Sequence, residues 1–146
     1  SFNLNSVVEN AIKTFEGEAK KKNICFEFSE APQEIIADRD KMSQVFVNLI
    51  SNAVKYTDSG TIKISFDQKP DMLEIKIRDT GIGISEKDLP HIFEYLYRSD
   101  ESRSRNTGGS GIGLSIVKSI ITAHAGRIYV QSEPGKGTEF TIEMNL

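Results

Sequence analysis

One amphipathic segment limits what this chain can fold into. Between Asp38 and Thr57 the apolar residues recur at the three-and-four spacing of a helix. The stripe consists of Met42, Val45, Phe46, Leu49, Ile50, Ala53 and Val54. So continuous a stripe has to be buried, and a sheet is the simplest surface that can cover it. We therefore predict a helix across this segment, ending near Thr57 and packed on a sheet.

Three polar residues of the same segment do not fit a plain solvent face. At about 100° per residue, Asn48, Asn52 and Lys55 fall on one strip beside the apolar stripe. Such a strip lies at the margin of the core, where a groove can open. An Asn offers a neutral oxygen to a hard cation, and a Lys offers positive charge to phosphate. The alternative is that Asn48 and Asn52 are two solvated amides on the flank of the helix. Their i, i+4 spacing, with Lys55 one turn further on, favours a binding site.

The rest of the chain alternates between helical and extended patterns. Helical spacing covers 5–22, a short piece within 85–98 and the segment after Gly113, whereas strand candidates cover 24–28, 34–37, 62–66, 73–77, 128–130 and 140–144. Turn residues at 69–71 and 134–137 make two hairpins of the last four strands. Because helices do not alternate singly with strands, the pattern argues against a doubly wound parallel sheet. We predict an α+β two-layer sandwich, a mixed and mostly antiparallel sheet with helices on one face.

A carboxylate follows the inward-facing alternation of Leu73, Ile75 and Ile77. Extending that alternation by two residues places Asp79 on the inward side, where an unpaired charge costs several kcal/mol. Gly81 and Gly83 follow at once, and they let the backbone turn tightly and approach a ligand. The alternative for Asp79 is an Asx-turn cap.

A long polar stretch precedes a glycine-rich helix start. No apolar residue occurs from Arg98 to Gly111, and a stretch of this length in a compact domain is typical of a functional lid or a disordered segment. We expect it to be largely disordered without a ligand. The backbone N–H groups of residues 108–114 can bind an anion at the helix start without a basic side chain.

Composition excludes several classes of protein. The chain has 146 residues, 38% hydrophobic and 27% charged, with a net charge of -3. This size suits one domain, and the acidic balance argues against a nucleic-acid surface. No apolar run is long enough for a membrane span. The single cysteine, Cys25, excludes an internal disulfide, and its strand pattern predicts a half-buried side chain.

Common nucleotide-site signatures are absent. Leu114 stands where a Walker A loop needs its lysine. It also stands where a dinucleotide-binding fingerprint needs its third glycine. The His-Arg-Asp and Asp-Phe-Gly signatures of eukaryotic-type protein kinases do not occur. No cluster resembles a zinc site. His124 on the apolar face of the last helix is expected to be a core or capping residue, and His91 to be solvated or packed.

Four segments in order resemble those of one family. Residues 44–57 resemble the N box, residues 79–84 the first glycine box, residues 93–100 the F box and residues 109–114 the second glycine box. With these motifs the chain is identified as similar to the catalytic ATP-binding domain of bacterial two-component sensor histidine kinases. These belong to the superfamily that also holds gyrase, Hsp-type chaperones and MutL. The resemblance covers nearly the whole chain.

The resemblance implies a role for each matching residue. Asn52 is implied as the Mg²⁺ ligand, with Asn48 beside the metal and Lys55 at phosphate. Asp79 is implied to accept a hydrogen bond from the adenine amino group, and Arg98 to contribute charge at the γ-phosphate. Further ATP contacts are implied for Tyr56, Gly81, Gly83, Ile84, Gly109, Ser110, Gly111, Ile112, Gly113 and Leu114. The implied cofactors are ATP and Mg²⁺.

The resemblance also sets the expected context. Residues 1–146 are one catalytic domain with an ATP lid at about 85–110. The helical dimerisation domain that carries the phosphoacceptor histidine is absent from the chain. The implied partners are that domain and a response regulator, with a monomeric isolated domain and a homodimeric parent. A cytoplasmic location is implied, and the resemblance allows the parent to be anchored in the inner membrane.

Some positions depart from the family pattern and keep alternatives open. Tyr95 and Leu96 stand where the F box commonly has a basic residue and Phe, and Ala125 replaces a common Gly. Asn48 occupies the position of a catalytic Glu in the family's ATPases, so efficient ATP hydrolysis is not expected. One alternative is a serine kinase of the anti-sigma-factor type, which shares the fold. Another is a nucleotide-sensing or pseudokinase interaction module that does not transfer a phosphoryl group.

Overall fold

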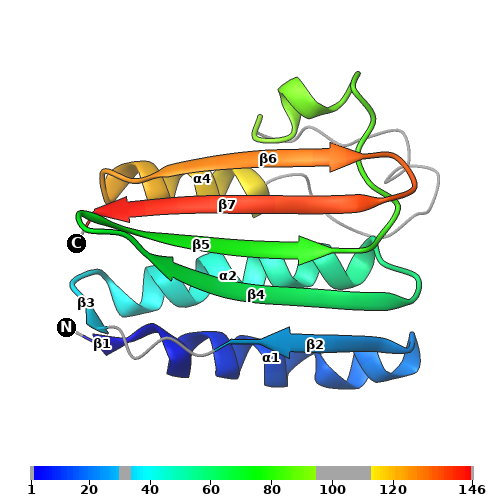
Figure 1. Ribbon diagram of the computed structural model, residues 1–146, viewed down its shortest axis with the longest axis horizontal. Helices are drawn as coiled ribbons and strands as arrows, with labels where there is room; N and C mark the ends of the chain where they lie inside the picture. The colour runs from blue at the N-terminus through cyan, green and yellow to red at the C-terminus, as the bar shows by residue number, and fades with distance from the viewer. Residues whose placement is uncertain (1, 30–33, 95–112, 146) are drawn as a thin grey trace.

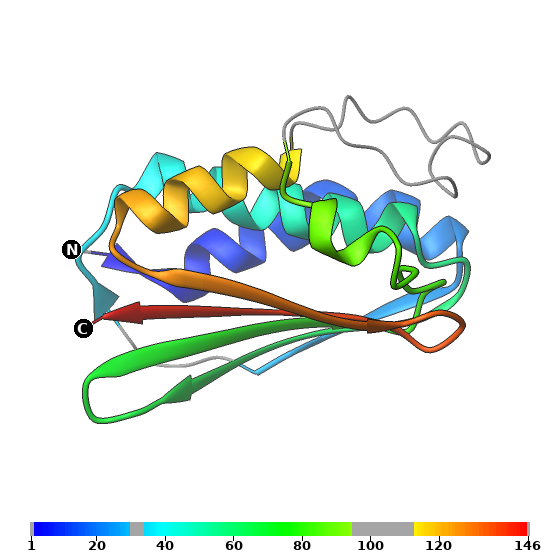
Figure 2. The same cartoon turned by 90° about the horizontal axis from the view of Figure 1, so that it is seen from above.

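The chain forms two layers, a sheet and a layer of helices on one of its faces (Figures 1 and 2). The computed structural model describes residues 2–29, 34–94 and 113–145. Its elements are β1 (Phe2–Asn3), α1 (Leu4–Lys21), β2 (Ile24–Phe28), β3 (Glu34–Ile35), α2 (Arg39–Lys55), β4 (Gly60–Gln68), β5 (Met72–Asp79), the 3₁₀ turn η1 (Leu89–His91), α4 (Gly113–Ala123), β6 (Arg127–Glu133) and β7 (Gly137–Asn145).

The main sheet has the strand order β2-β4-β5-β7-β6. Strand β2 runs parallel to β4, and the other neighbours are antiparallel. Helices α1, α2 and α4 cover one face, as Figure 2 shows edge-on. The predicted α+β sandwich with a mixed, mostly antiparallel sheet is therefore confirmed.

The core lies between α2 and the inner face of the sheet. All seven residues of the α2 stripe are buried, none more than 4% exposed. They face the inward residues of the hairpins, among them Ile62, Ile64, Ile75, Ile77 and Ile142. Helix α2 starts where Asp38 accepts a hydrogen bond from the Lys41 N–H, an N-cap that satisfies one otherwise free donor. The stripe thus fixes which side of α2 faces away from the core.

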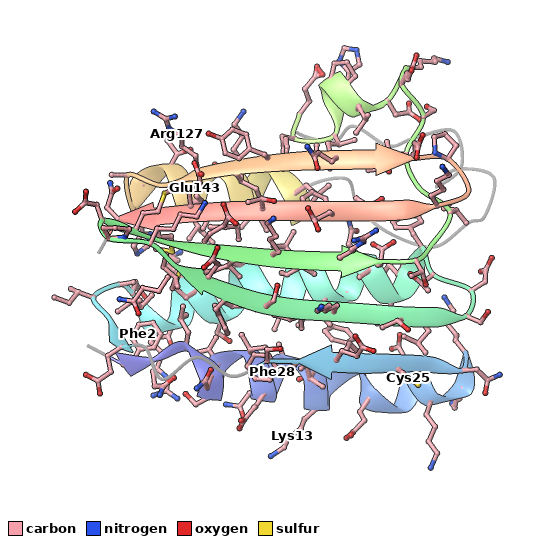
Figure 3. All side chains as sticks on the ribbon, viewed as in Figure 1. Phe2, Lys13, Cys25, Phe28, Arg127 and Glu143 are labelled. Carbon is pink, nitrogen blue, oxygen red and sulfur yellow. The ribbon has the colours of Figure 1, made fainter. Side chains whose placement is uncertain are left out.

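Within the described part of segment 85–98 the predicted short helical piece is the 3₁₀ turn η1. Two details differ from the sequence predictions. The strand predicted at 34–37 is only Glu34–Ile35, and it pairs with β1 outside the main sheet. Cys25 is exposed rather than half-buried. It lies on edge strand β2 (Figure 3), on the sheet face that no helix covers.

Among the described residues, no helix is both long and apolar enough to cross a membrane.

Helix α4 ends in a Schellman motif whose left-handed residue is an alanine. The Gly126 N–H donates to Ile121 O at 2.9 Å, and the Ala125 N–H donates to Thr122 O at 3.0 Å. Ala125 has φ of 58°, a conformation in which a Cβ costs about 1–2 kcal/mol.

We expect Ala125→Gly to stabilise the protein by about 0.5–1 kcal/mol, because relief of this strain exceeds the extra backbone entropy of glycine. Urea unfolding measures the change. Asn23→Gly is the matched control, since Asn23 has φ of 57° but asparagine tolerates that region and the gain there should be smaller. A loss of stability in Ala125→Gly would contradict this account.

Candidate functional site

The polar strip on α2 lies beside the start of α4. Asn48, Asn52 and Lys55 are each partly exposed along this side of the helix. The Asn48 side-chain amide donates to Gly113 O at 3.4 Å, joining α2 to the first residue of α4. The structure therefore brings the strip next to the helix start where the glycine-rich segment ends, although the two are far apart in sequence.

A lysine that follows α1 caps the C-terminal end of α2. The Lys22 ammonium donates to Val54 O at 2.7 Å and to Lys55 O at 3.2 Å. A cation at these carbonyls satisfies otherwise free acceptors and complements the helix dipole. From the sequence alone, Lys22 is expected to be the solvated last residue of a run of three lysines. Its contact with the end of α2 becomes visible only from the packing of α1 against α2. It anchors the turn that carries Lys55 and Tyr56.

Asp79 is the predicted site residue on the sheet. It is the last residue of β5 and 7% exposed, so the predicted inward position is confirmed. Its Oδ1 accepts the Gly81 N–H at 2.9 Å and the Thr138 N–H at 3.3 Å. The bond to Gly81 is the Asx-turn contact that the sequence left open. Among the described residues nothing donates to Oδ2, which remains available as an acceptor.

Burial dominates the electrostatics of this carboxylate. It raises the pKa of Asp79 to about 6 from 3.8, and the hydrogen bonds from Gly81 and Thr138 only partly oppose that rise. Near neutral pH the group is mostly ionised and still lacks a donor at Oδ2. A ligand with a hydrogen-bond donor is what this oxygen requires.

The loop after Asp79 rests on two other segments. The Ile82 N–H donates to Tyr56 O at 2.9 Å, which attaches the loop to the end of α2. On its other side, the Gly135 N–H donates to Ile82 O at 2.8 Å and the Ile84 N–H donates to Ser132 Oγ at 2.7 Å. The β6–β7 turn therefore sets the position of the loop.

Side chains are excluded where the loop meets these segments. A Cβ on Gly81 would lie 2.2 Å from Tyr56 O, and one on Gly137 would lie 2.0 Å from Asp79 O. The sequence analysis missed Ser132, Gly137 and Thr138 as parts of the site. The glycines at 135 and 137 indicate a tight turn in the sequence. No nearby residue pattern indicates that this turn contacts the loop after Asp79.

Several predicted site residues lie outside the described residues. These are Arg98, Gly109, Ser110, Gly111 and Ile112, together with Tyr95 and Leu96 of the F-box-like segment. Most of the predicted lid at 85–110, and the disorder expected of it, fall there too. Gly113, Leu114 and Ile84 are described and partly buried. Phe93 packs edge-to-face on Phe140, with the centroids 6.2 Å apart.

The described side chains offer a divalent metal few ligands of their own. No group of three or more His, Cys, Asp or Glu side chains within 2–29, 34–94 and 113–145 could hold a metal ion. Mg²⁺ is commonly bound by one or two protein oxygens together with substrate phosphates and water. The amide oxygen of Asn52 fits such a site, because Asn52 is partly exposed and lies one turn along α2 from the contact between Asn48 and Gly113. Within the described residues, a metal held by His, Cys, Asp and Glu side chains alone does not fit.

The two histidines have structural contacts. His91 is exposed and its Nδ1 lies 2.8 Å from a Glu94 carboxylate oxygen. His124 is partly buried and contacts the ends of two helices, with Ile120 O at 2.8 Å from Nδ1 and the Asp38 N at 3.2 Å from Nε2. Both contacts agree with the packing and capping predictions.

Known proteins share this sequence pattern and this fold. Residues 37–146 match the family model for the "Histidine kinase-, DNA gyrase B-, and HSP90-like ATPase". The sensor histidine kinase WalK of Bacillus subtilis (strain 168) is 43% identical over 110 residues, 73% of this chain and 18% of WalK. The mycobacterial sensor histidine kinase MprB is similar in structure, with a TM-score of 0.85, 26% identity and coverage of 99% of this chain and 95% of that one.

A third similarity is to a longer protein. The structure of full-length ShkA in complex with AMPPNP has a TM-score of 0.83 and 26% identity, and it covers 98% of this chain and 30% of ShkA. The chain therefore corresponds to a minor part of the length of WalK and of ShkA.

Proposed function

Because the chain belongs to the histidine kinase-, DNA gyrase B- and HSP90-like ATPase family, we propose that it binds Mg-ATP and donates the γ-phosphoryl group to a histidine. That histidine lies on a separate dimerisation domain of the parent kinase, from which the phosphoryl group passes to a response-regulator aspartate. Residues 1–146 act as one catalytic ATP-binding domain. The domain is monomeric in isolation and part of a homodimeric parent, on the cytoplasmic side if the parent is anchored in a membrane.

The observation that carries the proposal is the buried Asp79 carboxylate with one oxygen satisfied and one available. Oδ1 is held by the Gly81 and Thr138 N–H groups, so Oδ2 faces a ligand in a fixed direction. Adenine presents an amino group at its 6-position, whereas guanine presents a carbonyl oxygen there. Two acceptors cannot form a hydrogen bond. Asp79 thus selects adenine over guanine, while Tyr56, Gly81, Gly83 and Ile84 surround the base.

The triphosphate lies between α2 and the start of α4. Asn52 would hold Mg²⁺, with Asn48 beside it, and the ion would supply positive charge to the phosphate oxygens. Lys55 and Arg98 add charge to the phosphates, and the N–H groups of Gly109, Gly111 and Gly113 bind them from the helix start. Ser110, Ile112 and Leu114 complete this phosphate loop.

This set is sufficient for transfer and poor for hydrolysis. Phosphoryl transfer depends mainly on positioning and charge neutralisation. Asn48 lies where it could orient an oxygen but cannot remove a proton from water. The chain's own residues therefore hold ATP ready for an incoming histidine and do not activate a water molecule.

Thermal unfolding with and without Mg-ATP tests the site. Ligand at about 100 times its dissociation constant stabilises a protein by roughly 2.7 kcal/mol, a Tm increase of about 5–10 °C for a chain of this size. We expect this increase to be larger with Mg²⁺ than with EDTA. In Asn52→Ala the increase should be small and independent of Mg²⁺.

Asn10→Ala is the matched control, because Asn10 is exposed on α1 and should respond to Mg-ATP as the wild type does. No Tm increase at millimolar Mg-ATP would contradict the proposal and favour an interaction module. A domain that binds Mg-ATP but phosphorylates a partner serine, and no histidine-bearing helical domain, would instead indicate a serine kinase.

A further inference from the structure

A histidine away from the nucleotide joins the two helices that form the phosphate site. His124 follows the last residue of α4, and its Nδ1 lies 2.8 Å from Ile120 O within the same helix. Its Nε2 accepts the backbone N–H of Asp38 at 3.2 Å. Asp38 is the N-cap residue of α2. One imidazole ring therefore bridges the C-terminal end of α4 and the N-terminal end of α2.

The two contacts fix the protonation of the ring. The Asp38 N–H can only donate, so Nε2 must carry a lone pair. Ile120 O can only accept, so Nδ1 must carry the proton. The ring is the neutral Nδ1–H tautomer, and it satisfies one free carbonyl of α4 and one backbone donor at the start of α2.

Helices α2 and α4 run antiparallel side by side, as Figure 2 shows. They are hydrogen-bonded to one another at both ends of α4. At the nucleotide end Asn48 donates to Gly113 O, and at the far end Asp38 donates to His124. The 11 residues of α4 separate these contacts by about 16 Å at the helical rise of roughly 1.5 Å per residue.

We propose that His124 is a positioning residue for the triphosphate. Helix α2 carries Asn52, and α4 begins at Gly113. The hydrogen bond from Asp38 to His124 therefore sets the distance between the metal ligand and the first backbone amide of α4. The adenine pocket is built on Asp79 of β5 and on Tyr56 at the end of α2. These two segments are joined directly by the hydrogen bond from the Ile82 N–H to Tyr56 O, and not through the contact between α2 and α4. The inference rests on the proposed function, because it concerns the same nucleotide site.

Two substitutions separate the two contacts of the ring. The amide of glutamine reaches the position of Nε2, so His124→Gln can keep the contact to Asp38 and lose the contact to Ile120. The amide of asparagine reaches the position of Nδ1, so His124→Asn keeps the cap on α4 and loses the contact to α2. Titration calorimetry with Mg-AMPPNP, and displacement of a fluorescent ATP analogue by AMP, measure binding in both variants.

We expect His124→Asn to weaken Mg-AMPPNP binding about fivefold, with His124→Gln within twofold of the wild type. AMP, which lacks the β- and γ-phosphates, should bind equally to all three proteins. Equal weakening of AMP and Mg-AMPPNP would overturn the proposal and indicate a purely structural role. So would an unchanged His124→Asn, or a His124→Gln that binds more weakly than His124→Asn. Failure of the proposed function is distinct, because the wild type would then not bind Mg-AMPPNP.

Discussion

Replacing Asp79 by asparagine is expected to weaken ATP binding about 10- to 100-fold while making the free protein more stable. The Gly81 and Thr138 N–H groups must both donate to one side-chain oxygen, so they orient the asparagine with its amide oxygen toward them. The NH₂ group then faces the ligand. Adenine's amino group meets a donor instead of a charged acceptor, a loss of at least 1.5–3 kcal/mol and about 10- to 100-fold in affinity.

The stability change follows from the pKa of Asp79, which burial raises to about 6 from 3.8. The folded protein binds this proton more tightly than the unfolded chain does. Stability is therefore highest below the unfolded pKa and is lost as the pH rises through about 6. At about 1.4 kcal/mol per pKa unit, the ionised carboxylate costs about 3 kcal/mol at pH 7. Asparagine removes that cost.

Urea unfolding at pH 5 and pH 7, together with calorimetric titration of Mg-ATP, measures both effects. The stability advantage of Asp79→Asn should be larger at pH 7 than at pH 5, because the wild-type carboxylate is mostly neutral at the lower pH. ATP should bind the wild type less tightly below pH 6, as the acceptor becomes protonated. An Asp79→Asn variant that is less stable at pH 7, or that binds ATP normally, would contradict the account.

Gly137→Ala is the second change with a large expected effect. Gly137 has φ of 118°, and a Cβ there would lie 2.0 Å from Asp79 O and 2.9 Å from Asp79 C. Backbone atoms cannot move aside as a flexible side chain can. We expect a loss of about 3 kcal/mol or more in unfolding free energy, from left-handed strain together with this collision. Displacement of Asp79 should also weaken ATP binding at least tenfold.

Gly135→Ala in the same turn is the matched control. Gly135 has φ of 81°, but a Cβ there meets nothing within 4 Å. Its cost should be the strain alone, about 1 kcal/mol, with ATP affinity retained. If both variants lose equal stability and equal affinity, the contact between the β6–β7 turn and Asp79 is not what supports the site.

The parts of the fold that could be predicted from the sequence are those with a clear local periodicity of apolar residues. The stripe on α2 and the alternation in β4, β5 and β7 depend on neighbouring residues, and both were confirmed. The same alternation placed Asp79 inward. Cys25 was misjudged because alternation shows that two faces differ, but on an edge strand it does not show how well either face is covered.

The support of the site was much less visible in the sequence. Lys22, Thr138 and the bridge from His124 to Asp38 each join segments separated by more than thirty residues. Such contacts depend on how helices and strands pack, which no short pattern specifies. The resemblance to a family indicated which residues meet the nucleotide. It did not indicate which residues hold those residues in place.

The most direct test of the central claim is a residue-resolved nucleotide titration. Amide NMR spectra of the ¹⁵N-labelled chain would be followed as Mg-AMPPNP is added. Saturable shifts are predicted for the Gly81 and Thr138 amides, which donate to the Asp79 carboxylate, and for Gly113 at the start of α4. Residues of the uncovered sheet face, such as Lys63 and Thr141, should not shift. Shifts on that face with none at Gly81 or Thr138, or no saturable shift at millimolar nucleotide, would contradict the account.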